Sequence, residues 1–432
     1  MLKQLLFPFY LILFALLSCD KDHQKGLDDD FPPSPSDKGR RTVLMYCAAQ
    51  NSLGYQSYSR KSCWFNDSLE LAAGSQFIPE DDRLLVFVDD AYHPRLYHFS
   101  ANMPPQLVFQ WGYDACSTHP GTFKEVLQRV KERFPADEYG LCMWSHADGW
   151  IPSSNTNYSM STLSFGIDVG SNGYMNTDKT SDGRTQGAQM DIPDMANAIR
   201  QSGLHFKYIF FDACLMQCVE SGYELRDVTD YIIASPISIH GNGAYYTHML
   251  ERALFSNNPC DIAQTYYEDV NSEELVEEYD GFGIVISALK TSELPQLAEA
   301  VREALKEVDL HAYPDLSQAH SYHLYHSSFY YRPHYYDMRS ALRQLVTAEA
   351  FEQVERALSR AIPFCAATHR YYVASFKFFP PEFNNYDAMD CCGVSMFFPR
   401  SEYAKNASQC IFGNHNTTYT RTAWAKAIGK AN

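Results

Sequence analysis

The chain has 432 residues, of which 45% are hydrophobic and 20% are charged, and its 52 acidic and 35 basic side chains give a net charge of −17. This length and apolar content exclude a disulfide-stapled miniprotein and a wholly disordered chain, because they suffice for one large domain or two ordinary ones with buried cores. The acidity and the lack of a long Lys/Arg run argue against nucleic acid as the partner, since phosphate contacts need a basic surface.

The first 40 residues carry the features of an export signal followed by a tether. Lys3 precedes an apolar run that is shorter than the roughly 20 residues of a membrane-spanning helix, so residues 1–19 are predicted to be a signal peptide. Its Leu-Leu-Ser-Cys end resembles the bacterial lipobox, which implies that Cys19 is lipidated and anchors the protein in the cell envelope, facing the periplasm or the cell surface. The alternative is that Cys19 merely ends an ordinary apolar segment. Residues 20–40, rich in Asp, Pro and Ser, are predicted to form a flexible tether.

Apolar runs typical of buried strands then alternate with segments of helical periodicity. The expected strands are 42–48, 83–88, 139–145, 207–212, 231–234 and 281–288, with a hairpin at 95–111 and helices at 62–73, 121–134 and 293–308. Continuous apolar runs suit strands that are covered on both faces, and the strand–helix–strand repetition predicts a mostly parallel α/β sheet. Ligands bind at the carboxyl ends of the strands in such sheets.

Two parts of the chain depart from this pattern. Residues 151–189 are a long stretch rich in Ser, Asn, Gly and Asp, and a loop of this size in a compact domain is usually functional or disordered. Residues 291–432 are expected to be a mixed α+β C-terminal extension of a core at 41–290. Within the extension we expect a helix near 338–362, strands at 371–379 and 393–398, and a last helix near 419–428.

Reactive residue types follow two of the predicted strands. His146 comes directly after the strand at 139–145, and Cys214 follows the strand at 207–212. A thiol becomes a strong nucleophile only when it is deprotonated, so a histidine within reach is the expected activator. From these residues alone, a catalytic dyad and a buried histidine beside a small hydrophobic cysteine are about equally well supported.

The residues around the two positions carry a family resemblance. His-Ala-Asp-Gly-Trp at 146–150 and Phe-Asp-Ala-Cys-Leu-Met at 211–216 resemble the clostripain family of cysteine peptidases, which are relatives of caspases, gingipains and legumains. The resemblance covers about residues 42–288. It implies a caspase-like α/β fold with helices on both faces of the sheet, and an endopeptidase whose substrates are peptides or proteins.

The resemblance also implies roles for single residues. His146 would be the general acid/base, Cys214 the nucleophile that forms a thioacyl intermediate, and the backbone N–H groups of Ala147 and Cys214 the oxyanion hole. Asp212 would line the pocket for the P1 side chain and favour Arg or Lys there; it could also cap the following helix, and the two roles do not exclude each other. The chain departs from the family pattern at Ala147, where Gly is usual, and at Asn242, a second substrate-binding candidate, where an Asp is common.

Further expectations follow from the same resemblance. Family members are often zymogens that are cut between the His and Cys strands, and Lys179 and Arg184 in the long loop are the candidate processing sites. Calcium dependence is known in the family, although no cofactor is required by the sequence and no metal ligands are predicted. We expect a monomer. The alternative function is a catalytically impaired relative that binds peptides or glycans as an envelope lipoprotein.

Overall fold

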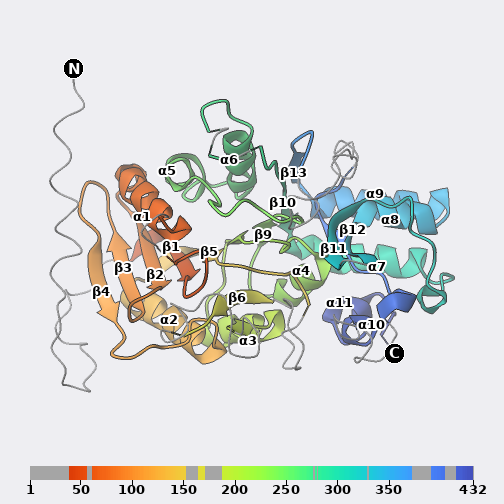
Figure 1. The fold of residues 1–432 in the computed structure, drawn as a ribbon, viewed down its shortest axis with the longest axis horizontal. Helices are drawn as coiled ribbons and strands as arrows, with labels where there is room; N and C mark the ends of the chain where they lie inside the picture. Colours follow the sequence, from red (N-terminus) through yellow and green to blue (C-terminus); the bar gives the residue numbers. More distant parts are fainter. Residues whose placement is uncertain are drawn as a thin grey trace.

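The computed structural model describes residues 38–55, 61–151, 164–170, 187–275, 278–279, 281–327, 330–371, 391–403 and 415–431. A nine-stranded sheet of order β13-β10-β9-β8-β5-β1-β2-β3-β4 lies at its centre (Figure 1). Its strands are β1 (Gly39–Ala48), β2 (Asp82–Asp89), β3 (Arg95–Phe99), β4 (Gln106–Gln110), β5 (Ala136–Trp144), β8 (Tyr208–Asp212), β9 (Tyr231–Ala234), β10 (Val285–Lys290) and β13 (Phe364–Ala367). Neighbouring strands are parallel from β9 to β2 and antiparallel towards both edges.

Helices cover both faces of this sheet. On one face lie α1 (Cys63–Gly74), α5 (Tyr246–His248) and α6 (Cys260–Val270); on the other lie α2 (Pro120–Arg133), α3 (Ile192–Ser202), α4 (Val219–Leu225), α7 (Leu294–Ala304) and α9 (Ala348–Ala361). Alternate residues of β1 enter different cores, Leu44 and Tyr46 on one side and Val43 and Met45 on the other. This two-sided burial explains the continuous apolar runs, and the predicted mostly parallel α/β sheet is confirmed.

Several predicted elements differ in their bounds. The single helix expected at 338–362 is two helices, α8 (Met338–Leu345) and α9, because Thr347 caps α9 by accepting a hydrogen bond from Ala350 N. The last helix, expected at 419–428, is also two short ones, α10 (His415–Tyr419) and α11 (Ala423–Ala427). The strand expected at 393–398 shortens to β14 (Ser395–Met396), and most of the one expected at 371–379 lies outside the described residues.

The predicted C-terminal extension packs directly against the core. Its strand β13 extends the central sheet by pairing with β10, and a smaller sheet of β11 (Ser321–Ser327), β12 (Tyr330–Asp337) and β14 lies beside it. Ser395 N donates to Gln217 O at 2.9 Å, and Tyr335 Oη donates to Asp148 O at 2.5 Å. The boundary at residue 290 stays a prediction, while these hydrogen bonds place the later residues against the segments that follow β5 and β8.

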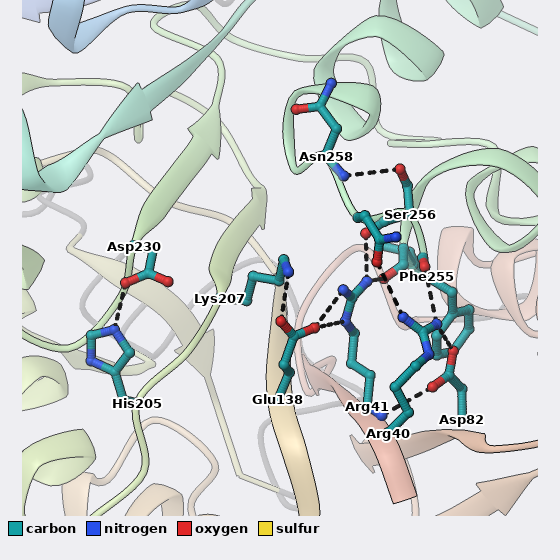
Figure 2. Close-up of polar contacts among 12 residues, drawn as sticks. Arg40, Arg41, Asp82, Glu138, His205, Lys207, Asp230, Phe255, Ser256 and Asn258 are labelled. Atoms are coloured by element: carbon teal, nitrogen blue, oxygen red, sulfur yellow. Dashed lines mark hydrogen bonds and ion pairs between the residues drawn. The ribbon is translucent and has the colours of Figure 1, made fainter.

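Charged side chains join the amino-terminal ends of three central strands (Figure 2). Glu138 of β5 accepts hydrogen bonds from Arg41 of β1 and from Lys207, which precedes β8, each at 2.6 Å. Partial burial alone would raise the pKa of Glu138, but the hydrogen bonds from Lys207 and Arg41 hold this pKa below its usual value. Arg41 is fully buried, and its guanidinium also donates to Ser256 O at 2.6 Å.

We expect Arg41→Met to lower the free energy of unfolding by about 2 kcal/mol, because it removes a buried guanidinium and leaves the carbonyl oxygens of Leu254 and Ser256 without this donor. Urea denaturation of the purified protein measures the change. The matched control is Arg356→Met, whose contact with Glu352 joins side chains that are 55% and 73% exposed; it should cost less than about 0.5 kcal/mol. Equal losses in the two variants would show that the network contributes no more than a surface ion pair.

Candidate active site

The strand register brings His146 and Cys214 to one edge of the sheet. Strands β5 and β8 are parallel neighbours, and Trp144 at the end of β5 is paired with Asp212 at the end of β8. His146 and Cys214 each follow two residues later, so both leave the carboxyl edge from adjacent strands. Ligands bind at this edge in open α/β sheets. The structure therefore gathers the two predicted reactive residues at the expected place.

Each of the two side chains forms hydrogen bonds with a different neighbouring residue. The Cys214 Sγ accepts a hydrogen bond from Ile239 N at 3.4 Å and lies 3.9 Å from Ile239 O. The His146 Nε2 lies 2.9 Å from Ser52 Oγ, in the segment that follows β1. Within the described part of the chain, no hydrogen bond links Cys214 to His146. Catalytic hydrogen bonds are often longer before substrate binds, so this arrangement suits a resting site.

Desolvation sets the charge state of the pair. Burial lowers the pKa of His146 to about 4. Burial also raises the pKa of Cys214 to about 11, and the negative charges of Asp148 and Asp212 add to this rise while the Ile239 N–H opposes it. At neutral pH the resting site therefore contains a neutral imidazole and a neutral thiol. A thiolate has to form during the reaction itself.

The backbone N–H of Ala147 points away from its neighbouring strand. Ala147 forms an isolated antiparallel bridge with Phe165, the first residue of β6 (Phe165–Asp168), which pairs with β7 (Ala188–Met190). The hydrogen bonds on either side of this bridge belong to His146 and Asp148. Ala147 and Phe165 are thus a non-hydrogen-bonded pair, in which the N–H and C=O groups of Ala147 face away from Phe165. Its N–H has no acceptor among the residues that the structure describes.

The N–H of Cys214 also has no acceptor within the described ranges, because β8 ends at Asp212. Leu215, the next residue, adopts a left-handed conformation with φ of 62°, and its N–H donates to Ile237 O at 3.0 Å. Such a conformation is uncommon for a residue other than glycine and often occurs at functional sites. It turns the chain sharply at the end of β8, directly after the thiol.

Asp212 lies beneath the segment that precedes α5. Its Oδ2 accepts hydrogen bonds from Ala244 N at 3.0 Å and from Tyr246 Oη at 2.8 Å, and Oδ1 accepts from Tyr266 Oη at 3.4 Å. Gly243, with φ of 61°, covers the carboxylate so closely that a Cβ there would lie 2.4 Å from Oδ2. Burial raises the pKa of Asp212 to about 6, against these hydrogen bonds, which lower it.

These contacts exclude one of the two roles considered for Asp212. The helix after Cys214 is α4, which begins at Val219 with Cys218 as its N-cap and has no side-chain cap. The alternative that Asp212 caps this helix is therefore wrong, because the carboxylate is already bonded to residues around α5 and α6. The role in P1 selection stays a prediction.

Asn242 is paired with an acidic residue that the sequence analysis missed. Its Nδ2 donates to Glu278 Oε1 at 2.7 Å and to Glu278 O at 3.1 Å. Glu278 comes 36 residues later in an irregular segment, so no periodicity or motif marked it. The side chain of Glu278 is exposed. A carboxylate consequently stands next to the position at which the chain lacks the acid common in the family.

Other predictions are not addressed by the described residues. Cys19, Lys179 and Arg184 lie outside them, as does most of the loop at 151–189. Among the residues with described positions, no three His, Cys, Asp or Glu side chains are grouped in a way that could hold a metal ion, so no step is assigned to calcium. None of the helices in the described ranges is long and apolar enough to span a membrane.

Comparisons with known proteins identify the family. The model of the clostripain family matches residues 45–363. Clostripain from Hathewaya histolytica is 24% identical in an alignment of 257 positions that covers 51% of this chain and 44% of that protein, so the chain spans less than half of this relative's length.

Solved structures of C11 cysteine proteases are also similar to this chain. A secreted C11 cysteine protease from Bacteroides thetaiotaomicron, in complex with an irreversible peptide inhibitor, matches with a TM-score of 0.69 and 26% identity over 90% of this chain and 99% of that one. An inactive zymogen C11 protease from Parabacteroides distasonis has the same TM-score at 24% identity, covering 91% of this chain and 99% of that one. The expected caspase-like α/β fold is confirmed.

The neutral resting pair leads to a test by alkylation. Because only thiolate reacts with iodoacetamide and the pKa of Cys214 is raised to about 11, we expect its alkylation rate to rise about tenfold per pH unit between pH 7 and pH 9. Mass spectrometry of the Cys214 peptide measures the rate, and His146→Ala should leave it nearly unchanged. A plateau below pH 8 that His146→Ala removes would instead reveal a preformed thiolate–imidazolium pair.

Proposed function

The chain belongs to the clostripain family of cysteine peptidases, and from this premise we propose that it is an endopeptidase with Cys214 as nucleophile and His146 as general acid/base. The observation that carries the proposal is the register of β5 and β8, because each of the two residues follows two positions after the end of its strand, at the ligand-binding edge of the sheet. The outward N–H groups of Ala147 and Cys214 support it, since acyl transfer needs donors for a developing oxyanion.

The proposed reaction uses these groups in turn. The Cys214 thiol gives its proton to His146 as sulfur attacks the scissile carbonyl carbon, and the N–H groups of Ala147 and Cys214 donate to the resulting oxyanion. The tetrahedral intermediate collapses when the C–N bond breaks and the leaving amine takes the proton from His146. Water, deprotonated by His146, then hydrolyses the thioester and restores the thiol.

A cationic P1 side chain is favoured by the acids near Asp212. Burial raises the pKa of Glu70 to about 8, and the charges of Glu278 and Asp212 raise it further, against a hydrogen bond from Tyr246 N. The charges of Asp212 and Glu278 thus act on Glu70 as a negative potential, which a bound guanidinium or ammonium group would relieve. Glu278, next to Asn242, supplies an exposed carboxylate for this purpose.

The place where the first strand enters the sheet is relevant to the proposed anchor. Strand β1 begins at Gly39, at the sheet edge where Arg41 and Glu138 pair, and the catalytic residues follow the opposite edge. The bound predicted for the tether, residue 40, is two residues too late, because Gly39 and Arg40 already belong to β1. If Cys19 is lipidated, the tether reaches the domain at the edge opposite the catalytic residues. We propose a monomer that this tether holds in the bacterial cell envelope, with the catalytic edge away from the point of attachment.

The dyad is tested with peptide libraries incubated with wild-type protein and with the Cys214→Ala and His146→Ala variants. We expect turnover by the wild type and a loss of more than about 10³-fold in either variant, because nucleophile and base act as a unit. Equal turnover in all three proteins would disprove the dyad. Peptide or glycan binding without turnover by the wild type would support the impaired-relative alternative.

Intact-mass measurement of the same preparations tests processing. The wild type should accumulate two chains cut after Lys179 or Arg184, whereas Cys214→Ala should stay whole. Uncut wild-type protein with full peptidase activity would contradict the zymogen proposal and leave the dyad untouched.

The P1 preference is tested with Glu278→Gln. We expect kcat/KM for substrates with Arg at P1 to fall about fivefold, as is usual for an exposed charge pair, and the loss to shrink at high salt. Substrates with an uncharged P1 side chain should be unaffected. The matched control is Glu274→Gln, an exposed acid of the same segment, and an equal effect of both variants would assign the loss to net charge.

A further inference from the structure

Ser52 is in contact with the catalytic histidine although no sequence pattern marked it. Its Oγ lies 2.9 Å from His146 Nε2. The side chain is exposed, and within the described chain this is the only hydrogen bond that its hydroxyl makes. A serine hydroxyl can donate or accept, so the contact by itself leaves the direction of the hydrogen bond open.

The segment that carries Ser52 is held firmly in place. Asn51 Nδ2 donates to Ala48 O at 2.8 Å and to Ile167 O at 2.9 Å, which ties the segment to the end of β1 and to β6. On its other side, Asn51 Oδ1 accepts from Leu53 N at 3.0 Å. Ser52 therefore stands between two residues whose backbone positions are fixed, and its hydroxyl needs little reorganisation to stay against the imidazole.

We propose that Ser52 is a positioning residue that keeps the proton of neutral His146 on Nε2, with Ser52 Oγ as its acceptor, and leaves Nδ1 as the base that receives the Cys214 proton. This proposal rests on the catalytic roles proposed above. Because Ser52 occupies Nε2, Nδ1 is the ring nitrogen left for the thiol. If Ser52 donated to Nε2 instead, Nδ1 would carry the proton and could not act as a base.

The same hydrogen bond helps after proton transfer. The imidazolium form of His146 donates from both nitrogens, and a hydrogen bond from a charged donor is stronger than one from a neutral donor. Ser52 Oγ therefore stabilises the protonated ring more than the neutral one. Its loss should lower the pKa of His146 during turnover and slow the step that creates the imidazolium.

Steady-state kinetics test the proposal with Ser52→Ala, Ser52→Thr and a matched control. We expect Ser52→Ala to lower kcat about three- to tenfold with KM unchanged, as for the loss of one hydrogen bond to a charged group. The acid limb of its pH–kcat profile should move to lower pH, and Ser52→Thr should restore both values. The control is Ser100→Ala, since Ser100 Oγ lies 3.4 Å from His98 Nε2 on β3 and β3 carries no proposed catalytic residue.

A second measurement does not need peptidase activity. Long-range ¹H–¹⁵N spectra of histidine-labelled protein should show the His146 proton on Nε2 in the wild type and a mixture of tautomers in Ser52→Ala. If the wild type gives this spectrum but shows no turnover, the proposed function is wrong, whereas the proposed position of the His146 proton still holds. A wild-type proton on Nδ1, an unchanged Ser52→Ala variant, or a Ser52→Ala variant with higher kcat would overturn the proposal for Ser52.

Discussion

The pairing of β5 with β8 is the constraint on which the candidate site depends. Trp144 faces Asp212 in a parallel register, and a shift of one residue would move one reactive side chain out of line with the other. Both strands are buried on two faces, so register is specified by two cores at once. Polar groups are tolerated only where the strands end, because a charge in the middle of such a strand would lose its hydration without compensation.

The two edges of the sheet use charge differently. At the amino-terminal edge, Glu138 is matched by Arg41 and Lys207, so opposite charges cancel and join three strands. At the carboxyl edge, no ion pair is found for Asp212 or Glu70 among the described residues; burial raises the pKa of both acids, and nearby negative charges raise that of Glu70 further. The first arrangement lowers the energy of the folded chain, whereas the second holds unfavourable electrostatic energy that a cationic ligand can release.

The sequence allowed the parallel sheet and the positions of His146 and Cys214 to be predicted, because both depend on local patterns: apolar runs for the strands and short motifs at their ends. Glu278 and Ser52 could not be predicted, since they reach the site from irregular segments whose positions are set by tertiary packing. The same holds for β13, whose place in the central sheet depends on pairing with a strand about 80 residues earlier in the chain. The sequence predicted a single helix at 338–362, because Thr347, which ends one helix and caps the next, leaves the periodicity of the apolar residues unchanged.

The charge state of the resting site connects its structure to its chemistry. With a pKa of about 11 for Cys214 and about 4 for His146, proton transfer between them is unfavourable in the unliganded protein. In the proposed oxyanion hole, the N–H groups of Ala147 and Cys214 would offset this cost only when an oxyanion forms, which requires a bound substrate carbonyl. In the proposed mechanism, the geometry therefore favours transfer of the thiol proton together with attack on the substrate, so that Cys214 stays a neutral thiol before substrate binds.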